Sequence, residues 1–232
     1  MTRFLARLFA TIAMCWLSFG IAEAREGQLR PVTKDYDFGA VGVDFRIAYD
    51  FKFVNSGATP IRIDEADVHC DCTEARFKDS LVAPNDTANV TIIFNTADFY
   101  GPVNKSLSIR SNDPITPNLQ VWYHATVGQW LYSVEPAPVS LLFLPTHKTR
   151  TLKLTNHALD FLELDHIEKL DSTVSVKVLA NRCAKGGKIE LEVTADPQLG
   201  PGEHVTNFTL EFKVPEGLAP LRITIPVKVV RF

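Results

Sequence analysis

The stretch DFKFVNSGATPIRID, residues 50–64, places two runs of alternating apolar and polar residues on either side of an Asn-Ser-Gly turn signal. Successive side chains of an extended strand point to opposite faces, so Phe51 and Phe53 share one face of the first run. Ile61 and Ile63 share one face of the second run for the same reason. The stretch therefore predicts two short strands joined by a tight connection, each with one face directed into a core.

The same alternation continues along the rest of the chain, with turn signals between the runs. Alternating apolar side chains occur at Tyr49, Phe51 and Phe53; Val90, Ile92 and Phe94; Leu107 and Ile109; Leu152 and Leu154; Leu162 and Leu164; Val174, Val176 and Val178; Ile189, Leu191 and Val193; Phe208, Leu210 and Phe212; and Ile223, Ile225, Val227 and Val229. After the first two dozen residues the sequence shows no long apolar stripe at the spacing of a helix. These patterns predict an all-β protein.

The opening stretch has a counterpart in the second half of the chain. Residues 151–165, TLKLTNHALDFLELD, match residues 50–64 at a shift of 101 residues. The shift aligns three identical pairs: Lys52 with Lys153, Asn55 with Asn156, and Asp64 with Asp165. A repeat of about 100 residues fits two sandwiches of about seven strands each, and not a solenoid of small units. We therefore expect two tandem immunoglobulin-like β-sandwich domains, residues 25–128 and 129–232, with the boundary near Gly128.

The N-terminal segment MTRFLARLFATIAMCWLSFGIAEA, residues 1–24, combines two arginines, an apolar run and the ending Ala22-Glu23-Ala24. A basic start, a short apolar run and an Ala-x-Ala ending are typical of a secretory signal peptide. The run is shorter than the roughly 20 apolar residues of a membrane-spanning helix, so a retained anchor is the weaker alternative. We expect cleavage near Ala24, loss of Cys15 with the signal, and a mature protein that is periplasmic or secreted. Its relation to the membrane would be through export only.

The composition argues against several classes of partner and enzyme. The formal net charge of the 232-residue chain is −3, and basic residues do not cluster, so nucleic acid is not an expected partner. The sequence has no Gly-x-Ser-x-Gly, His-Glu-x-x-His, Walker or Gly-x-Gly-x-x-Gly motif. We therefore expect no enzyme, no small-molecule substrate and no cofactor, with copper as the one alternative.

Five segments of the first half carry a resemblance to a known family. They are YDFGAV (36–41), FKFVNSGATPIRI (51–63), CDCT (70–73), LVAPNDTANVTIIFNT (81–96) and GPVNKSLSIRSNDP (101–114). In this order they closely resemble the bacterial DUF1573 proteins, relatives of the ASH, MSP and PapD-like immunoglobulin-fold domains. The resemblance covers roughly residues 35–127 and implies the fold and export, but no activity. The family usually has Cys-Gly-Cys-Thr where this chain has Asp71, and the second half resembles a diverged copy with Asp171 and Thr173 at the positions of the cysteines.

The cysteines Cys70 and Cys72 are separated by one residue and preceded by His69. In an extended strand their Cα atoms would lie about 6.6 to 7 Å apart, so a disulfide between them requires a bend. Three interpretations stay open: a reducible disulfide or thiol pair, two inert and mostly buried thiols, or a Cu(I) site to which His69 adds a nitrogen. No second cluster supplies the remaining ligands of a zinc site.

The third cysteine beyond the predicted signal, Cys183, lies next to Arg182 and close to Lys185. These cations would lower the pKa of its thiol if the side chain were exposed. An isolated thiol in a loop before a strand is the favoured interpretation.

The segment LQVWYHATV, residues 119–127, contains consecutive bulky side chains. A strand buries only one face in its own sheet, so part of this run must face outward or toward the other domain. We expect Trp122, Tyr123 and His124, together with Trp130 just past the domain boundary, to form an interdomain or partner contact.

These observations predict a non-enzymatic binding or structural module of the bacterial cell envelope. Recognition of a protein partner would run through sheet edges and the surface between the domains. The alternative is a redox-active or Cu(I)-handling periplasmic protein that uses Cys70 and Cys72.

Overall fold

The computed structural model describes residues 26–128, 134–135, 141–146, 148–157, 159–213 and 221–232. The predicted signal peptide with Cys15 and Ala24 lies outside these residues, as does Trp130. All the regular elements in the described residues are β-strands, which confirms the predicted all-β class. Within the same residues, no helix is long and apolar enough to span a membrane.

The described residues of the first half, 26–128, form nine strands. They are β1 (Leu29–Pro31), β2 (Asp35–Val41), β3 (Arg46–Asn55), β4 (Ile61–Asp67), β5 (Thr73–Phe77), β6 (Leu81–Val82), β7 (Thr87–Asn95), β8 (Gly101–Ser111) and β9 (Asn118–Val127). The alternation read from the sequence is seen in their burial: on β7, Val90, Ile92 and Phe94 are fully buried while the residues between them are more exposed.

The described residues of the second half, between 134 and 232, form the other nine strands. They are β10 (Val134–Glu135), β11 (Leu141–Phe143), β12 (Thr149–Asn156), β13 (Phe161–Lys169), β14 (Val174–Ala180), β15 (Arg182–Ala184), β16 (Lys188–Ala195), β17 (Gly202–Phe212) and β18 (Leu221–Arg231).

The two halves repeat the same strand order. One sheet of the first half has the order β1-β3-β7-β5, and its counterpart in the second half has the order β10-β12-β16-β14. The opposite layer runs β6-β4-β8-β9-β2 in the first half and β15-β13-β17-β18-β11 in the second. In both halves the last of these strands is parallel to its neighbour, since β2 pairs with β9 and β11 with β18. The repeat seen in the sequence is thus a repeat of topology.

Each half has a hydrophobic core of its own. The buried cluster of the first half is drawn from residues between Leu29 and Val127, and that of the second from residues between Leu141 and Val229. The aligned asparagines Asn55 and Asn156 are fully buried at the ends of β3 and β12. Each donates its amide to a carbonyl of the following turn, at 2.8 Å in both halves, so the same residue supports the same turn twice.

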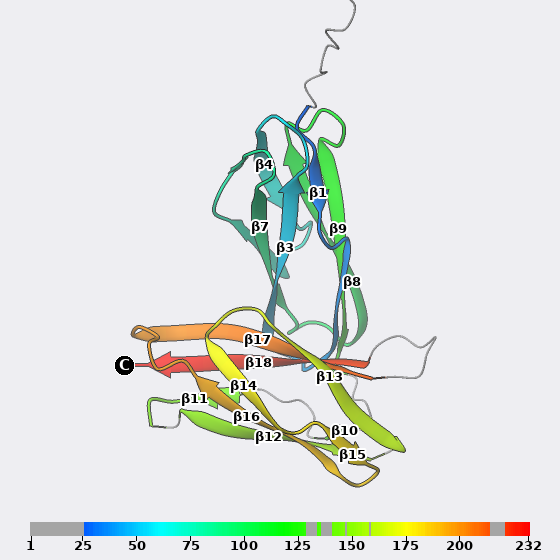
Figure 1. The fold of residues 1–232 in the computed structure, drawn as a ribbon, viewed down its shortest axis with the longest axis vertical. Helices are drawn as coiled ribbons and strands as arrows, with labels where there is room; N and C mark the ends of the chain where they lie inside the picture. The colour runs from blue at the N-terminus through cyan, green and yellow to red at the C-terminus, as the bar shows by residue number, and fades with distance from the viewer. Residues whose placement is uncertain (1–25, 129–133, 136–140, 147, 158, 214–220) are drawn as a thin grey trace, which may run out of the picture.

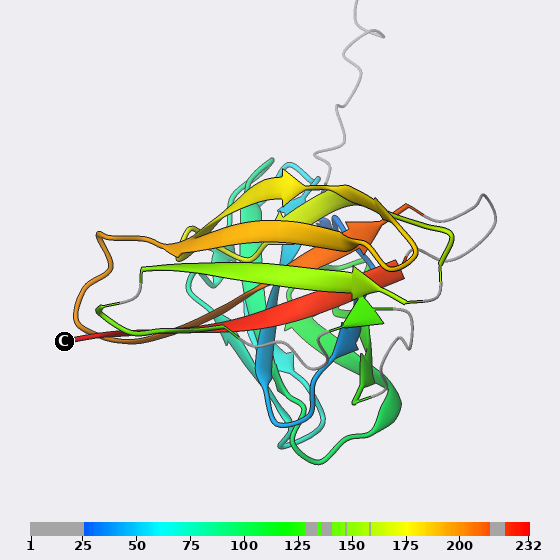
Figure 2. The ribbon, with the colours of Figure 1, turned by 90° about the horizontal axis from the view of Figure 1, so that it is seen from below.

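The halves are joined by a strand pair as well as by the chain. β18 pairs in parallel with β2 through Ile223 and Ala40, so that the inner layers form one ten-stranded sheet. Figure 1 shows the strands of the first half running along the long axis of the molecule and those of the second half crossing it. Figure 2, seen from below, shows β12, β16 and β14 forming the layer farthest from the first half. The domain boundary near Gly128 stays a prediction.

Candidate functional site

Cys70 and Cys72 lie in the turn between β4 and β5, where they form a disulfide with a Cα–Cα distance of 5.3 Å. The bend that the pair requires is present, because this distance is shorter than that of an extended strand, and His69 just before the pair has a φ of 52°. Asp71, which replaces the glycine usual in the family, is not among the residues with positive φ. The turn therefore needs no glycine between the cysteines. The redox role of the pair stays a prediction.

The two sulfurs lie over a buried pair of hydroxyls. Thr73 Oγ1 is 3.8 Å from Cys70 Sγ and 3.7 Å from Cys72 Sγ. The same oxygen is 2.7 Å from the hydroxyl of Tyr123, which belongs to β9 of the opposite layer. Burial raises the pKa of Tyr123, and the hydrogen bond to Thr73 opposes that shift. The hydroxyls of Tyr123 and Thr73 thus connect the core to the disulfide.

The side chain of His69 contacts polar residues of β4 and β8. Its Nδ1 lies 2.8 Å from Asp67 Oδ2, and its Nε2 lies 3.2 Å from Ser108 Oγ. Among the described residues there is no group of three or more His, Cys, Asp or Glu placed to hold a metal ion. In the disulfide form both sulfurs are already bonded, so a Cu(I) site at His69, Cys70 and Cys72 stays a prediction for the reduced form.

Cys183 is a free thiol on β15 and is half-buried against the core of the second half. Burial raises the pKa of its thiol. The neighbouring Arg182 is directed elsewhere, with its guanidinium 4.0 Å from the ring of Phe161 and 3.6 Å from Glu163. The sequence-based expectation that cations lower this pKa applied to an exposed thiol, and that condition is not met.

The aromatic run on β9 divides between two environments. Tyr123 is 1% exposed and belongs to the core of the first half, so its prediction as an interface residue is wrong. The reason is the strand period of two, which turns Tyr123 inward with Val121. Trp122 is 43% exposed, and His124 contacts Asp35 at 2.6 Å and Asn104, both in the same half. Their role in binding stays a prediction.

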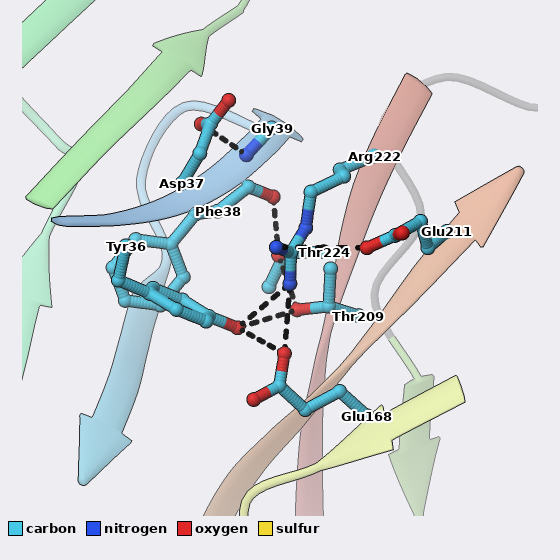
Figure 3. A network of polar contacts seen from close by, with 9 residues as sticks. All are labelled: Tyr36, Asp37, Phe38, Gly39, Glu168, Thr209, Glu211, Arg222 and Thr224. Carbon is cyan, nitrogen blue, oxygen red and sulfur yellow. Dashed lines mark hydrogen bonds and ion pairs between the residues drawn. The ribbon is translucent and has the colours of Figure 1, made fainter. Parts of the chain in front are cut away.

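The contact between the halves is centred on Tyr36 of β2, Glu168 of β13 and Arg222 of β18. The Tyr36 hydroxyl donates to Glu168 Oε2 at 3.0 Å, and Arg222 donates to the same oxygen at 2.7 Å. The Arg222 guanidinium lies 4.9 Å from the centre of the Tyr36 ring. Figure 3 shows these side chains converging from three strands, with Glu211 on the other side of the arginine. Charge, hydrogen bonding and ring stacking therefore act together at the junction.

Further polar contacts extend this junction along the strands. Thr224 donates to the carbonyl of Phe38 at 2.6 Å, and its hydroxyl lies 2.8 Å from that of Thr209. The backbone N–H of Ala48, on β3, donates to Asn207 Oδ1 at 2.7 Å. Breaking the junction would remove the Thr224 hydroxyl from the buried carbonyl of Phe38 and the Asn207 side chain from the partly buried N–H of Ala48.

A cleft of about 250 Å³ opens beside the junction. It is lined by residues of both halves, among them Tyr36, Tyr49, Asp50, Lys52, Glu168 and Asn207. Tyr49 stacks on Tyr36 with ring centres 3.5 Å apart. Burial raises the pKa of both phenols, so both rings stay neutral donors at physiological pH.

Sequence reasoning did not identify the junction residues. On β17 and β18, Thr209, Arg222 and Thr224 alternate with apolar residues, a pattern that predicts a solvated face. The first half covers that face, and Thr209 and Thr224 are 1% and 2% exposed. A signal that could have revealed them is Arg222, between Leu221 and Ile223 of the last strand, because a buried arginine requires a carboxylate partner.

The sheets also end in free edges. β1 and β5 are the outer strands of one four-stranded sheet, and β10 and β14 are the outer strands of the other. β1 contains Pro31, and β5 carries the exposed ion pair of Glu74 and Arg76. β14 is the longest of these four strands and exposes Val178 by 42% and Leu179 by 48%.

Comparison with known proteins finds a family match in the first half of the chain. Residues 29–127 match the model of the family described as "Protein of unknown function (DUF1573)". The matched segment is less than half of the chain, and it is similar to a DUF1573 domain. The resemblance drawn from its motifs over residues 35–127 is confirmed, and it assigns no activity. No curated protein matches the sequence.

The solved structures that this chain is similar to are distant from it. A protein of unknown function from Porphyromonas gingivalis W83 is 12% identical, with 86% of this chain and 99% of that chain covered and a TM-score of 0.34. The E. coli chaperone DraB is 10% identical, with coverages of 86% and 97% and a TM-score of 0.35. An ASH/PapD-like domain of human CEP192 is 10% identical, with coverages of 45% and 86% and a TM-score of 0.36. Nothing about function follows from likenesses at this level.

Proposed function

We propose that this chain is an exported, non-enzymatic binding module of the bacterial envelope that holds an extended segment of a partner protein along β14. The observation that carries the proposal is the edge of β14, seven residues long and without a second neighbouring strand among the described residues. An edge strand presents a row of N–H and C=O groups that an incoming strand can pair with.

The side chains of β14 favour this edge over β5. Natural edge strands are protected by charges, prolines or bulges, and β5 has its Glu74–Arg76 pair. β14 has one charged residue, Lys177, and exposes Val178 and Leu179 at its end. The register shift between Val178 and Ala180 confines irregular pairing to that end, leaving the preceding residues regular. We infer that a partner segment with apolar side chains at its end would match this edge.

The junction supports a role in presenting this edge in a fixed orientation. The contacts of Tyr36, Glu168 and Arg222 hold the second half against the first, while β14 lies in the layer farthest from the first half. Export and a location in the periplasm or outside the cell rest on the predicted signal peptide at residues 1–24. The partner is therefore expected to be an envelope protein, and not nucleic acid or a small molecule.

The test replaces Val178 and Leu179 with lysine and measures crosslinking of the exported protein to its envelope partner in the native host. Two added charges on a pairing edge should reduce recovery of the crosslinked partner about tenfold or more. Ile115→Lys is the matched control, because Ile115 is 64% exposed but lies in the loop before β9 of the first half. Circular dichroism should show that both variants are folded. Unchanged recovery with the β14 variant would rule out this edge as the contact.

A further inference from the structure

The Cys70–Cys72 disulfide, in the turn formed by residues 68–72, is poorly explained by a purely structural role. A disulfide stabilises a fold mainly by closing a loop, and its effect grows with loop length. Cys70 and Cys72 are only two residues apart, so this bridge closes a very short loop. The turn is also held by other contacts: the N–H of Asn95 donates to the carbonyl of Cys72 at 2.8 Å, and that of His69 donates to Asp67 at 3.0 Å.

We propose that the Cys70–Cys72 disulfide is a thiol–disulfide exchange site that a dithiol opens and that closes again without unfolding of the protein. Both cysteines are half-buried, so the bond lies at the surface of the fold. Because the turn and the strands on either side keep their own hydrogen bonds, the two thiols would stay close together after reduction.

The two sulfurs are not equivalent. Cys72 packs against the core of the first half, whereas Cys70 does not belong to that cluster. An attacking thiolate therefore reaches Cys70 Sγ more easily, and Cys72 Sγ is the leaving group. A thiolate of the dithiol forms a bond to Cys70 Sγ as the Cys70–Cys72 bond breaks, and the electron pair of that bond goes to Cys72.

The second thiol of the dithiol completes the exchange. It attacks the mixed disulfide, releases Cys70 as a thiolate and leaves the dithiol oxidised to its own disulfide. The protein gains two electrons and two protons, and the dithiol loses the same number. A disulfide of the same chemical class reverses both steps.

Thr73 is placed to assist the departure of the Cys72 thiolate. Its Oγ1 is 3.7 Å from Cys72 Sγ and 2.7 Å from the Tyr123 hydroxyl. A disulfide sulfur accepts but does not donate, so Thr73 donates toward the sulfurs and accepts from Tyr123. A hydrogen bond stabilises the thiolate more than the bonded sulfur, which makes Cys72 a better leaving group. Thr73 is then a catalytic residue of the exchange, and Tyr123 is a positioning residue that orients it.

The first experiment uses the mature chain with Cys183→Ser, so that only Cys70 and Cys72 are counted. The protein is equilibrated in dithiothreitol buffers of increasing reducing strength, alkylated and weighed by mass spectrometry. We expect a single transition from no free thiol to two, with an unchanged β-type circular dichroism spectrum, and full reversal with oxidised dithiothreitol. The proposal is overturned if thiols appear only in denaturant, or if reduction abolishes the folded spectrum.

The second experiment measures the rate of opening by dithiothreitol in three variants of the same background. Thr73→Val removes the hydroxyl at nearly constant shape and should slow opening about tenfold, the effect of losing one charge-assisted hydrogen bond. Thr73→Ser keeps the hydroxyl and should restore most of the rate. Tyr123→Phe should slow opening less than Thr73→Val, because Thr73 stays in place. Equal rates in Thr73→Val and Thr73→Ser would overturn the role of the hydroxyl.

The third experiment tests which sulfur is attacked. With one cysteine left at a time, the single thiol of Cys72→Ser reports on Cys70, and that of Cys70→Ser reports on Cys72. Reaction with an aromatic disulfide reagent should be several times faster at Cys70, because thiol reactivity follows access. A faster reaction at Cys72 would reverse the assignment. Since the turn lies in the first half and β14 in the second, these outcomes are independent of the proposed binding edge.

Discussion

Tyr36 carries more of the junction than any other side chain of the first half. Its ring stacks on Tyr49, its hydroxyl contacts Glu168, and Arg222 lies over its ring. It is 5% exposed, and burial raises the pKa of its phenol well above the ordinary value of 10.0, an effect that Glu168 increases and that Thr209 and Arg222 oppose. The neutral phenol is therefore part of the folded junction.

This shift predicts how stability depends on alkaline pH. The pKa of Tyr36 is higher in the folded state than in the unfolded state. The neutral phenol therefore makes its full contribution to the free energy of unfolding below the unfolded-state pKa near 10.0, and this contribution is lost as pH rises above it. Above that pH the unfolded chain loses a proton that the folded chain keeps. The free energy of unfolding should then fall by about 1.4 kcal/mol per pH unit for this phenol.

Urea denaturation at a series of pH values from 9 upward, using roughly half-unit steps, would measure the slope for the wild type and for Tyr36→Phe. The variant loses hydrogen bonds and should be less stable throughout, so the informative quantity is the difference in slope. Tyr36→Phe should show a flatter decline above pH 10, with absorbance at 295 nm reporting phenol ionisation. Parallel curves for the two proteins would contradict the prediction.

Single residues also show which local features could be predicted from the sequence and which could not. Asn55 and Asn156 were aligned from the repeat, and both support the same turn because one amide serves donor and acceptor roles at once. The bend between Cys70 and Cys72 was required by geometry, but the positive φ of His69 just before it was not predictable. A positive φ outside glycine depends on the contacts around the residue, here those with Asp67 and Ser108.

At the scale of elements, β2 connects two sheets that the sequence pattern predicts to be separate. It pairs with β9 of its own half and touches β18 of the other through Ala40 and Ile223. The close approach depends on Gly39, which has a φ of +69° and accepts no side chain. A Cβ added there would lie 2.2 Å from the carbonyl oxygen of Arg222.

Gly39→Ala is therefore expected to separate β2 from β18. The substitution combines a left-handed backbone with a clash against fixed backbone atoms, which should lower the free energy of unfolding by about 2 kcal/mol or more. Urea denaturation measures this loss, and limited proteolysis measures opening between the halves. Gly200→Ala is the matched control, because a Cβ at Gly200 meets nothing within 4 Å. Equal stability of the two variants would show that β2 tolerates a shift away from β18.

The strands themselves follow from alternation, but their partners do not. On β17, the five consecutive residues from Thr206 to Leu210 are buried, although the sequence pattern predicts that every second one is solvated. The missing information is tertiary: the polar face of β17 and β18 is covered by the first half through Thr209 and Thr224. A polar face gives the same local pattern whether water or another sheet lies over it.

At the scale of the whole molecule, each half has its own core while one sheet runs through both. The buried clusters share no residue, which favours independent folding of each half. The shared sheet and the junction favour coupling, since separation would take Glu168 from the Tyr36 hydroxyl, the Thr224 hydroxyl from the carbonyl of Phe38, and Arg222 from the ring of Tyr36. The balance between these effects decides whether residues 25–128 are a domain or one part of a larger folding unit.

The hydrophobic core of the first half contains no residue of the second half. Residues 25–128 expressed alone should therefore give a β-type circular dichroism spectrum and one cooperative melt. Its melting temperature should lie below that of the first transition of the full chain, because loss of the junction leaves buried polar groups without partners. In the full chain, Tyr36→Phe should move the melt toward that of the fragment, whereas in the fragment it should have little effect. An unfolded fragment would show that the halves share one folding unit, and equal melting of fragment and full chain would show that the junction adds no stability.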